Sequence, residues 1–359
     1  TDKFITAFIE DTAQLGIKPA TQNPRVINYM DEIIAFVSIL IDKGFAYVSE
    51  GDVYFRVTKS NNYAKLANKT LEDLEIGASG RTDAETDRKE DPLDFALWKA
   101  AKEGEISWES PWGPGRPGWH IECSVMATEI LGDTIDIHGG GADLEFPHHT
   151  NEIAQSEAKT GKTFANYWMH NGFVNVDNEK MSKSLGNFVT VHDMLKTVDG
   201  QVLRFFLATQ QYRKPINFTE KAIHDAEVNL KYLKNTHSLP LTEEVSQAEL
   251  QAYLDAFQAA MDDDFNTANG VTVLFDMAKW INSGNYDETV KNAFEKILQV
   301  FGIVFEEETL DEDIEKLIEE RQAARANKDF ATADRIRDEL AAQGIKLLDT
   351  KEGVRWTRD

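Results

Sequence analysis

The alternation of helical and strand patterns between residues 119 and 176 constrains the fold of this chain more than any other feature. Apolar residues recur there first with helical spacing and then in short strand-like runs, and the order repeats. The successive segments (helix, strand, glycine triplet, helix, strand) occupy residues 119–131, 134–138, 139–141, 147–161 and 167–176. Alternation of this kind predicts a parallel α/β sheet.

The segments on either side of this unit predict other kinds of structure. Residues 24–43 have the apolar spacing of a core helix, and residues 46–57 predict a β-hairpin. Residues 108–118 contain three prolines and three glycines, which break helices and central strands alike. Beyond residue 190 the pattern is almost wholly helical. We therefore predict an α/β core with an inserted subdomain, followed by an α-helical bundle and a small C-terminal domain.

The charge balance limits the partners that the chain can bind. The 359 residues carry a formal net charge of -24, whereas nonspecific coating of nucleic acid needs clustered lysine and arginine. Any RNA partner must therefore be held by a local surface. Residues 241–320 hold 20 acidic and 4 basic side chains, while residues 321–359 hold 9 basic and 7 acidic ones. The C-terminal segment is the electropositive exception.

Cysteine usage and hydropathy indicate the compartment. Cys123 is the single cysteine, so the chain cannot form an internal disulfide, as is typical of proteins in a reducing cytosol. No apolar run approaches the roughly 20 residues that a membrane-spanning helix needs. We expect a cytoplasmic monomer without a membrane segment.

A possible metal site lies at the start of the second helix of the α/β unit. His148 and Glu152 are four residues apart, which places them on one helix face, and Cys123 comes from the preceding helix. Thiolate, imidazole and carboxylate together form a partial zinc shell, although structural zinc sites use four protein ligands. Taken alone, such a His and Glu can also be a solvated helix pair, and a lone cysteine a small buried hydrophobe.

Histidines and glycines in the same unit strengthen the case for a ligand site. Four of the eight histidines fall within thirty residues: His120, His138, His148 and His149. The glycine triplet follows a strand, where ligands of open α/β sheets bind, so Gly141 could approach a nucleotide and Asp143 could bond a ribose hydroxyl. A glycine triplet by itself can equally be only a loop.

Residues 179–187 contain the most specific signal in the chain. Lys180 and Lys183 lie three residues apart in a small, polar segment after a strand, where they could neutralise a triphosphate as pyrophosphate leaves. A lysine-rich surface turn is the alternative.

These motifs together resemble one enzyme family. Residues 180–184, Lys-Met-Ser-Lys-Ser, are the signature loop of class I aminoacyl-tRNA synthetases, and residues 118–124 and 146–156 are similar to the cysteinyl-tRNA synthetases specifically. Weaker similarity extends over the helical residues 261–267 and the terminal residues 353–356.

The resemblance implies a fold, a reaction and a set of site residues. It implies a partial Rossmann-type nucleotide-binding core, and an enzyme that activates cysteine with ATP and Mg²⁺ and transfers it to tRNA(Cys). The implied parts are the remainder of the first catalytic half, a connective insertion, the second catalytic half, a helical bundle and an anticodon-recognition domain, over residues 1–25, 26–116, 117–218, 219–310 and 311–359.

Residue by residue, the resemblance assigns three groups of side chains. The ligands of one zinc ion per chain would be Cys123, His148 and Glu152, and Trp119, His120 and Cys123 would line the cysteine pocket. The catalytic lysines would be Lys180 and Lys183, and the ATP contacts Gly141, Asp143, Met181, Ser182, Lys183 and Ser184.

The sequence departs from the family pattern at its beginning. The family's first ATP signature, His-Ile-Gly-His, does not occur here, and neither does the cysteine that is the fourth zinc ligand. We therefore expect an N-terminally truncated chain with a missing metal ligand. Two alternatives remain at this point: a cysteine:amino-sugar ligase of thiol biosynthesis, and an inactive RNA-binding fragment.

The C-terminal segment is the predicted RNA-binding region. Arg335 and Arg337 could reach phosphates or base edges of tRNA, and Trp356 could stack on an unpaired base. The alternative is a small packed domain whose arginines pair with nearby carboxylates and whose tryptophan belongs to the core.

Overall fold

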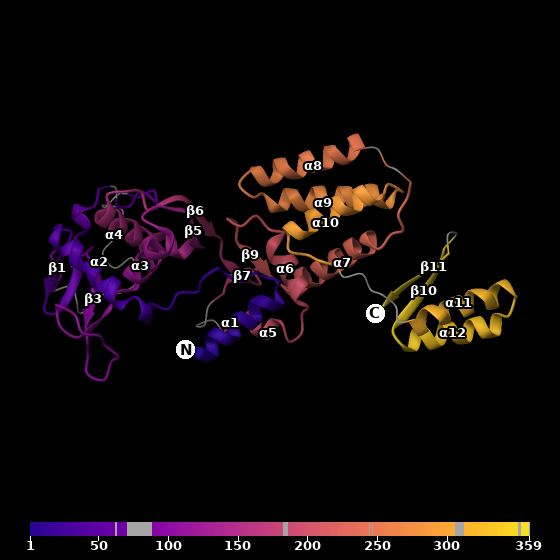
Figure 1. Ribbon diagram of the computed structural model, residues 1–359, viewed down its shortest axis with the longest axis horizontal. Coiled ribbons are helices and arrows are strands. Elements are labelled where there is room, and N and C mark those ends of the chain that lie inside the picture. The colour runs from indigo at the N-terminus through magenta and orange to yellow at the C-terminus, as the bar shows by residue number, and fades with distance from the viewer. Residues whose placement is uncertain are drawn as a thin grey trace. The chain divides into compact units, whose positions relative to one another are not determined.

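The computed structural model describes residues 1–61, 63–69, 88–181, 186–243, 245, 247–305, 312–350 and 353–358. The chain forms two compact units, Thr1–Ile303 and Val304–Asp359. Figure 1 shows their helices and strands in chain order. Within the described residues, no helix is both long and apolar enough to span a bilayer.

The chain begins with two helices, of which the sequence predicted only the second. Helix α1, Asp2–Gln14, has no buried residue, although Phe4, Phe8 and Ile9 give it apolar side chains at helical spacing, a signal that the prediction did not use. Helix α2, Met30–Asp42, is shorter than the predicted span of 24–43. Its first part is instead a 3₁₀ turn, Val26–Asn28, because Tyr29 leaves the helical backbone region with φ of -123° and ψ of 20°.

A four-stranded antiparallel sheet follows, with β1 (Ala46–Ser49), β2 (Asp52–Phe55), β3 (Phe95–Ala100) and β4 (Gly115–Pro117) in that spatial order. The predicted hairpin is confirmed as β1 and β2. Its two-residue turn has positive φ at both Glu50 (52°) and Gly51 (88°), the backbone that matches the twist of a hairpin. The proline-rich β4 lies at the sheet edge, where a missing N–H costs no ladder bond.

The face of this sheet packs against α2 to form a core cluster. Ile33, Val37 and Leu40 of α2 are fully buried there, together with Phe55 of β2 and Trp98 of β3. Burial of each of these five side chains stabilises the fold by roughly 1.5–3 kcal/mol, because apolar surface is removed from water. This core therefore anchors the subdomain that precedes the α/β unit.

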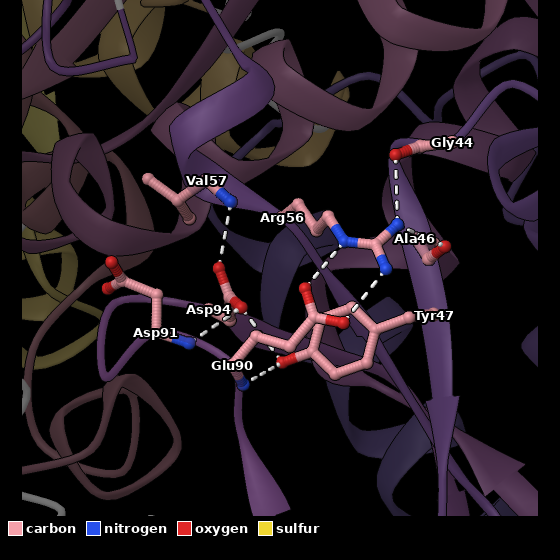
Figure 2. Close-up of polar contacts among 8 residues, drawn as sticks. All are labelled: Gly44, Ala46, Tyr47, Arg56, Val57, Glu90, Asp91 and Asp94. Atoms are coloured by element: carbon pink, nitrogen blue, oxygen red, sulfur yellow. Dashed lines mark hydrogen bonds and ion pairs between the residues drawn. The ribbon is translucent and has the colours of Figure 1, made fainter.

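One end of the sheet is fixed by a polar network (Figure 2). Asp94 is buried and accepts hydrogen bonds from the Tyr47 hydroxyl (2.8 Å), the Val57 amide (2.9 Å) and the Asp91 amide (3.2 Å). Nearby, Arg56 pairs with Glu90 at 2.7 Å and also donates to backbone carbonyls. Burial raises the pKa of Asp94 above its ordinary value, and the three donors act against that shift.

The α/β unit has the predicted order with three corrections. Helix α3 spans Trp119–Leu131 as predicted, and β5 (Ile135–Gly141) and β6 (Ala165–Asn171) pair in parallel. The glycine triplet is part of β5 rather than a loop, because it continues the ladder as far as the Gly141–Asn171 pair. The helix predicted from residue 147 is α4, Thr150–Thr160, after a π-helical turn, Glu145–His149.

The predicted strand at residues 167–176 is two strands. After β6 the chain breaks at Gly172 and continues as β7, Val174–Val176, which belongs to another sheet with β8 (Glu179–Lys180) and β9 (Ile216–Phe218). Strand β7 pairs parallel to β9 and antiparallel to β8. The signature loop therefore begins at β8, which is an edge strand of this short three-stranded sheet.

The remainder of the first unit is helical, as predicted. The helices are α5 (Val191–Met194), α6 (Gly200–Ala208), α7 (Glu220–His237), α8 (Gln247–Asp262), α9 (Thr267–Asn282) and α10 (Glu288–Val300). Arg204 of α6 holds two helix ends, because its guanidinium donates to Phe301 O (2.7 Å) after α10 and to Leu15 O (3.1 Å) after α1. Gly302, with φ of 73°, leaves the space that Arg204 occupies.

The second unit is small and contains its own core. Helices α11 (Glu312–Ala326) and α12 (Phe330–Ala342) pack together and are followed by an antiparallel pair, β10 (Ile345–Thr350) and β11 (Gly353–Arg358). Its core cluster consists of the buried residues Ile314, Ile336, Leu340 and Ile345. Residues 351–352, between the two strands, lie outside the described residues.

Candidate active site and metal centre

Helices α3 and α4 bring the three predicted metal ligands together. Cys123 lies in the second turn of α3, His148 in the π-helical turn before α4, and Glu152 in the first turn of α4. The Cys123 thiol, one His148 ring nitrogen and one Glu152 oxygen all lie within 4.8 Å of one another. This spacing is compatible with three donors around one cation.

The close approach of α3 to β3 sets where Cys123 lies. Gly118 precedes α3, and a Cβ at this position would stand 2.0 Å from the Ala96 carbonyl oxygen. The glycine is therefore needed for α3 to begin directly against the backbone of β3. Ile121 and Val125, on either side of Cys123, are fully buried and fix the rotation of the helix.

Glu152 is the most deeply buried charged group of the site. It has no exposed surface, and His148 Nε2 and His138 Nε2 lie 2.9 Å and 3.2 Å from its two oxygens. Both oxygens are fully buried, and the two imidazoles approach them at ion-pair distance with poorly aligned hydrogen-bond geometry. Burial favours the protonated carboxyl, but the two imidazoles outweigh it and lower the pKa of Glu152 to about 2. A buried carboxylate is costly unless positive charge compensates it, and a bound cation would do so.

The pKa of Cys123 is shifted in the opposite direction from that of Glu152. Burial, followed by the carboxylates of Glu152 and Glu122, raises the pKa of the Cys123 thiol to about 12. The thiol therefore stays protonated at neutral pH in the protein alone, and only a bound cation would favour its thiolate. The buried carboxylate and this thiol thus both fit a divalent metal of the zinc type.

Histidine rings surround the three donors. His120 Nδ1 lies 2.9 Å from His148 Nδ1, and the Trp119 ring packs over His148 with centroids 4.8 Å apart. The site thus brings the predicted substrate residues Trp119 and His120 against a predicted metal ligand. Trp119 remains 54% exposed, which leaves its ring accessible from solvent.

A second group of donors shares Glu152. His138, His149 and Glu152 also offer atoms within 4.8 Å of one another. His149 Nδ1 lies 2.8 Å from His170 Nε2, and burial lowers the pKa of His149 to about 4, so this ring is neutral at physiological pH. His170 was missed in the sequence. Its only signal was its place in the predicted strand 167–176, and the strand register sets it opposite Gly140.

The glycines of β5 make room for this histidine cluster. A Cβ at Gly140 would stand 2.8 Å from the His149 ring, and one at Gly141 would stand 2.4 Å from an Asp143 oxygen. Asp143 itself is exposed in the short turn Ala142–Leu144. Gly141 and Asp143, two of the predicted ATP contacts, therefore lie at the carboxyl end of a parallel strand, where α/β folds bind their ligands.

Only the beginning of the signature loop lies among the described residues. Lys180 is exposed at the end of β8, and its ammonium group stands 4.5 Å from the centre of the Phe173 ring. Met181 is half-buried and donates its amide hydrogen to Val174 O at 3.4 Å. Ser182, Lys183 and Ser184 lie outside the described residues.

The predicted RNA-binding side chains of the second unit have partners within it. Arg335 pairs with Glu339 at 3.1 Å, and Arg337 pairs with Asp334 and Asp338 at 3.0 Å each. The arginine side chains remain 63% and 50% exposed, so these pairs can be exchanged for other anions. Trp356 is half-buried and packs against the small core.

Protein-family models match three segments of the chain. Residues 1–228 match the model for the catalytic domain of class I (C) tRNA synthetases, residues 256–306 a DALR domain, and residues 307–356 the anticodon-binding domain of cysteinyl-tRNA ligase. The chain belongs to the cysteinyl-tRNA synthetase family. The family and the enzyme class predicted from the motifs are thereby confirmed.

Curated relatives of this synthetase family agree. The chain is 99% identical to the cysteine–tRNA ligase of Streptococcus thermophilus (strain CNRZ 1066) and 80% identical to that of Streptococcus agalactiae serotype V. In both cases the match covers 100% of this chain and 80% of the relative. Neither alternative, the amino-sugar ligase or the inactive fragment, finds support among these matches.

A solved structure supports the fold. The methionyl-tRNA synthetase of Mycobacterium tuberculosis, in complex with methionyl-adenylate, matches with a TM-score of 0.55 at 15% identity. The match covers 82% of this chain and 74% of that one. At this identity the likeness concerns the fold alone, and it confirms the predicted class I α/β core with a helical extension.

Proposed function

We propose that this chain holds the catalytic and tRNA-binding parts of an enzyme that activates cysteine with ATP and transfers it to tRNA(Cys). The observation that carries the proposal is the buried convergence of Cys123, His148 and Glu152 beside the carboxyl end of β5. Such an enzyme works in the cytoplasm, where tRNA is charged for translation, and uses ATP as its Mg²⁺ complex.

The donor set fits a zinc ion, which Cys123, His148 and Glu152 would hold. When bound, zinc supplies a soft Lewis acid that prefers the thiolate of cysteine to the hydroxyl of serine. Discrimination by ligand softness would make an editing site unnecessary, because a steric pocket alone separates such similar side chains poorly. Trp119 and His120, packed around His148, would then line the pocket for the substrate side chain.

The nucleotide would bind along the strand ends and the signature loop. In the first step the cysteine carboxylate attacks the α-phosphorus of ATP, and the bond to pyrophosphate breaks. Lys180 and Lys183 would stabilise the charge of the leaving pyrophosphate, and Met181, Ser182 and Ser184 would shape the loop around it. Gly141 and Asp143 would contact the ribose side of ATP. In the second step a terminal ribose hydroxyl of tRNA displaces AMP.

The remaining parts of the chain would bind the tRNA. We assign residues 219–310 to the helical bundle that supports tRNA docking and residues 311–359 to anticodon recognition. Arg335 and Arg337 would exchange their intrahelical carboxylates for tRNA phosphates, and Trp356 would stack on an unpaired base with its exposed face.

ATP–pyrophosphate exchange tests the proposal directly. The assay compares this chain with the full-length Streptococcus thermophilus ligase, each with cysteine or serine as the substrate. Cysteine should support exchange far better than serine, and Cys123→Ala should remove most of that preference. Glu122→Gln is the matched control, because Glu122 neighbours Cys123 on α3 and is not among the grouped donors. Equal exchange with the two amino acids in the full-length ligase would refute the proposal.

A further inference from the structure

The first lysine of the signature loop rests on an aromatic ring. The Lys180 ammonium lies 4.5 Å from the centroid of the Phe173 ring. Phe173 is 37% exposed, and Lys180 is exposed at the end of β8. Among the described residues Lys180 forms no ion pair with a carboxylate, although the chain carries a net charge of -24. The position of its charge is therefore set by the ring and by the backbone around it.

The backbone of Phe173 is held from both sides. The Ile216 amide donates to Phe173 O at 2.9 Å, and the Gly172 amide donates to Tyr212 O at 2.7 Å. Gly172 is pressed against the neighbouring loop so closely that a Cβ would stand 2.4 Å from the carbonyl carbon of Lys214. The backbone that carries the Phe173 ring is therefore restrained.

The loop that supports Phe173 is itself anchored to the helical part of the unit. Arg213 Nε pairs with Asp264 Oδ2 at 2.6 Å, and the Tyr212 hydroxyl donates to Asp264 Oδ1 at 2.9 Å. The Thr267 hydroxyl donates to Gln210 O at 2.8 Å in the same place. Asp264 adopts a positive φ of 52°, a backbone that non-glycine residues rarely keep unless their surroundings hold them.

The other partner of the contact is also restrained at its backbone. Lys180 pairs with Asn175 in the β7–β8 ladder, and the Asn187 side-chain amide donates to Lys180 O at 3.3 Å. Asn187 follows the signature loop, so this bond joins the two ends of the loop. With both backbones fixed, the ammonium–ring contact restricts mainly the lysine side chain, which limits its entropic cost.

We infer that Phe173 is a positioning residue for adenylate formation. It acts through a cation–π contact that holds the Lys180 ammonium near the strand ends where the nucleotide would bind. Phe173 follows the carboxyl end of β6 by two residues, and that end pairs with Gly141 of β5. A lysine held at this edge keeps its outer side open to the phosphates. The inference rests on the role proposed above for Lys180.

The size of the effect follows from the geometry. A cation–π contact at an exposed site contributes enough to change a rate about two- to fivefold when it is lost. Because the lysine acts on the leaving pyrophosphate, the loss should lower kcat and leave the KM for cysteine unchanged. Leucine is the sharpest replacement, since it keeps an apolar side chain but has no π face. Tyrosine keeps the π face.

A double-mutant cycle in the full-length Streptococcus thermophilus ligase tests the inference, with positions numbered as in this chain. Pyrophosphate-exchange kinetics are measured for Phe173→Leu, Phe173→Tyr, Lys180→Met and the Phe173→Leu/Lys180→Met double variant. We expect Phe173→Leu to lower kcat about two- to fivefold, Phe173→Tyr to behave as the parent, and Phe173→Leu to have no further effect once Lys180 is methionine.

The outcomes separate the inference from the proposed function. If Lys180→Met lowers kcat at least about tenfold but Phe173→Leu is silent, or acts equally in both backgrounds, the inference is overturned and the role of Lys180 stands. If Lys180→Met is itself silent, the proposed role of Lys180 fails and the inference fails with it. A fall in kcat that tyrosine does not rescue would also overturn it, because the ring would then matter only for packing.

Discussion

Replacing Asp94 by asparagine should destabilise the four-stranded sheet more than breaking any ion pair on its surface. Asp94 is 2% exposed and uses both carboxylate oxygens, one for the Val57 amide and the other for Tyr47 and the Asp91 amide. Asparagine retains one acceptor oxygen. Whichever way its amide turns, the NH₂ group faces a backbone N–H that can no longer be satisfied.

The magnitude follows from that one lost acceptor. A buried donor left without a partner costs about 1–3 kcal/mol, so Asp94→Asn should lower the free energy of unfolding by that amount at pH 7. Asp94→Ala removes the acceptors for all three donors and should cost about 3–5 kcal/mol. The matched control is Glu90→Gln in the neighbouring pair with Arg56, where the carboxylate side chain is 53% exposed and the effect should stay below about 1 kcal/mol.

The pH dependence has a definite sign. Because burial raises the pKa of Asp94 in the folded protein, its contribution to stability is complete below the unfolded pKa near 4 and is lost as pH rises through the folded pKa. Asparagine does not titrate. The stability difference between the parent and Asp94→Asn should therefore be larger at pH 4 than at pH 7.

Urea denaturation measures the free energy of unfolding of each variant. Hydrogen–deuterium exchange of β1 and β2 measures the local loss of stability. The Val57 amide and the strand amides around it should exchange faster in Asp94→Asn than in Glu90→Gln. Equal exchange and equal unfolding free energies in the two variants would refute the reasoning, because the buried acceptor would then be worth no more than an exposed one.

Three further predictions concern other parts of the chain. Zinc content measured by atomic emission should fall in Cys123→Ala and stay at the parent value in Glu122→Gln, and equal loss in both would contradict the metal assignment. Gly302→Ala should lower unfolding free energy by about 1–3 kcal/mol, because the new Cβ would stand 2.0 Å from Arg204 Nε; an unchanged urea midpoint would show that the guanidinium moves aside without cost. Trp356→Ala should weaken tRNA(Cys) binding in a filter assay by about 1–3 kcal/mol while pyrophosphate exchange persists, and unchanged affinity would place the ring in the core only.

Part of this protein could be predicted from sequence because the relevant signals are local. The helix Trp119–Leu131 was predicted with its observed bounds, since a glycine precedes it and its apolar spacing is complete. The hairpin of β1 and β2 was predicted because a two-residue turn fixes its own register. The motifs around Cys123, His148 and Lys180 identified the family for the same reason, because each is a short contiguous run.

The sequence also predicted three donors in one α/β unit, and the structure brings them together, but it could not specify how they are buried. Glu152 lies between His138 and His148, which approach its two oxygens from β5 and from the turn before α4. His170 joins the cluster through the parallel register of β6 on β5, which no local pattern encodes. Helix α1 was missed although Phe4, Phe8 and Ile9 have helical spacing, and its apolar side chains stay exposed in the structure.

Tertiary structure alone decided the contacts between distant segments. Tyr47 and Asp94 are 47 residues apart, and Arg213 and Asp264 are 51 apart, yet each pair lies within 2.8 Å. Phe173 and Lys180 are close in sequence, but their contact depends on a backbone held by Ile216 and Tyr212. Sequence patterns report which residues prefer a face or a turn, whereas the pairing of faces is set by the packing of the whole core, which has no counterpart in any local stretch.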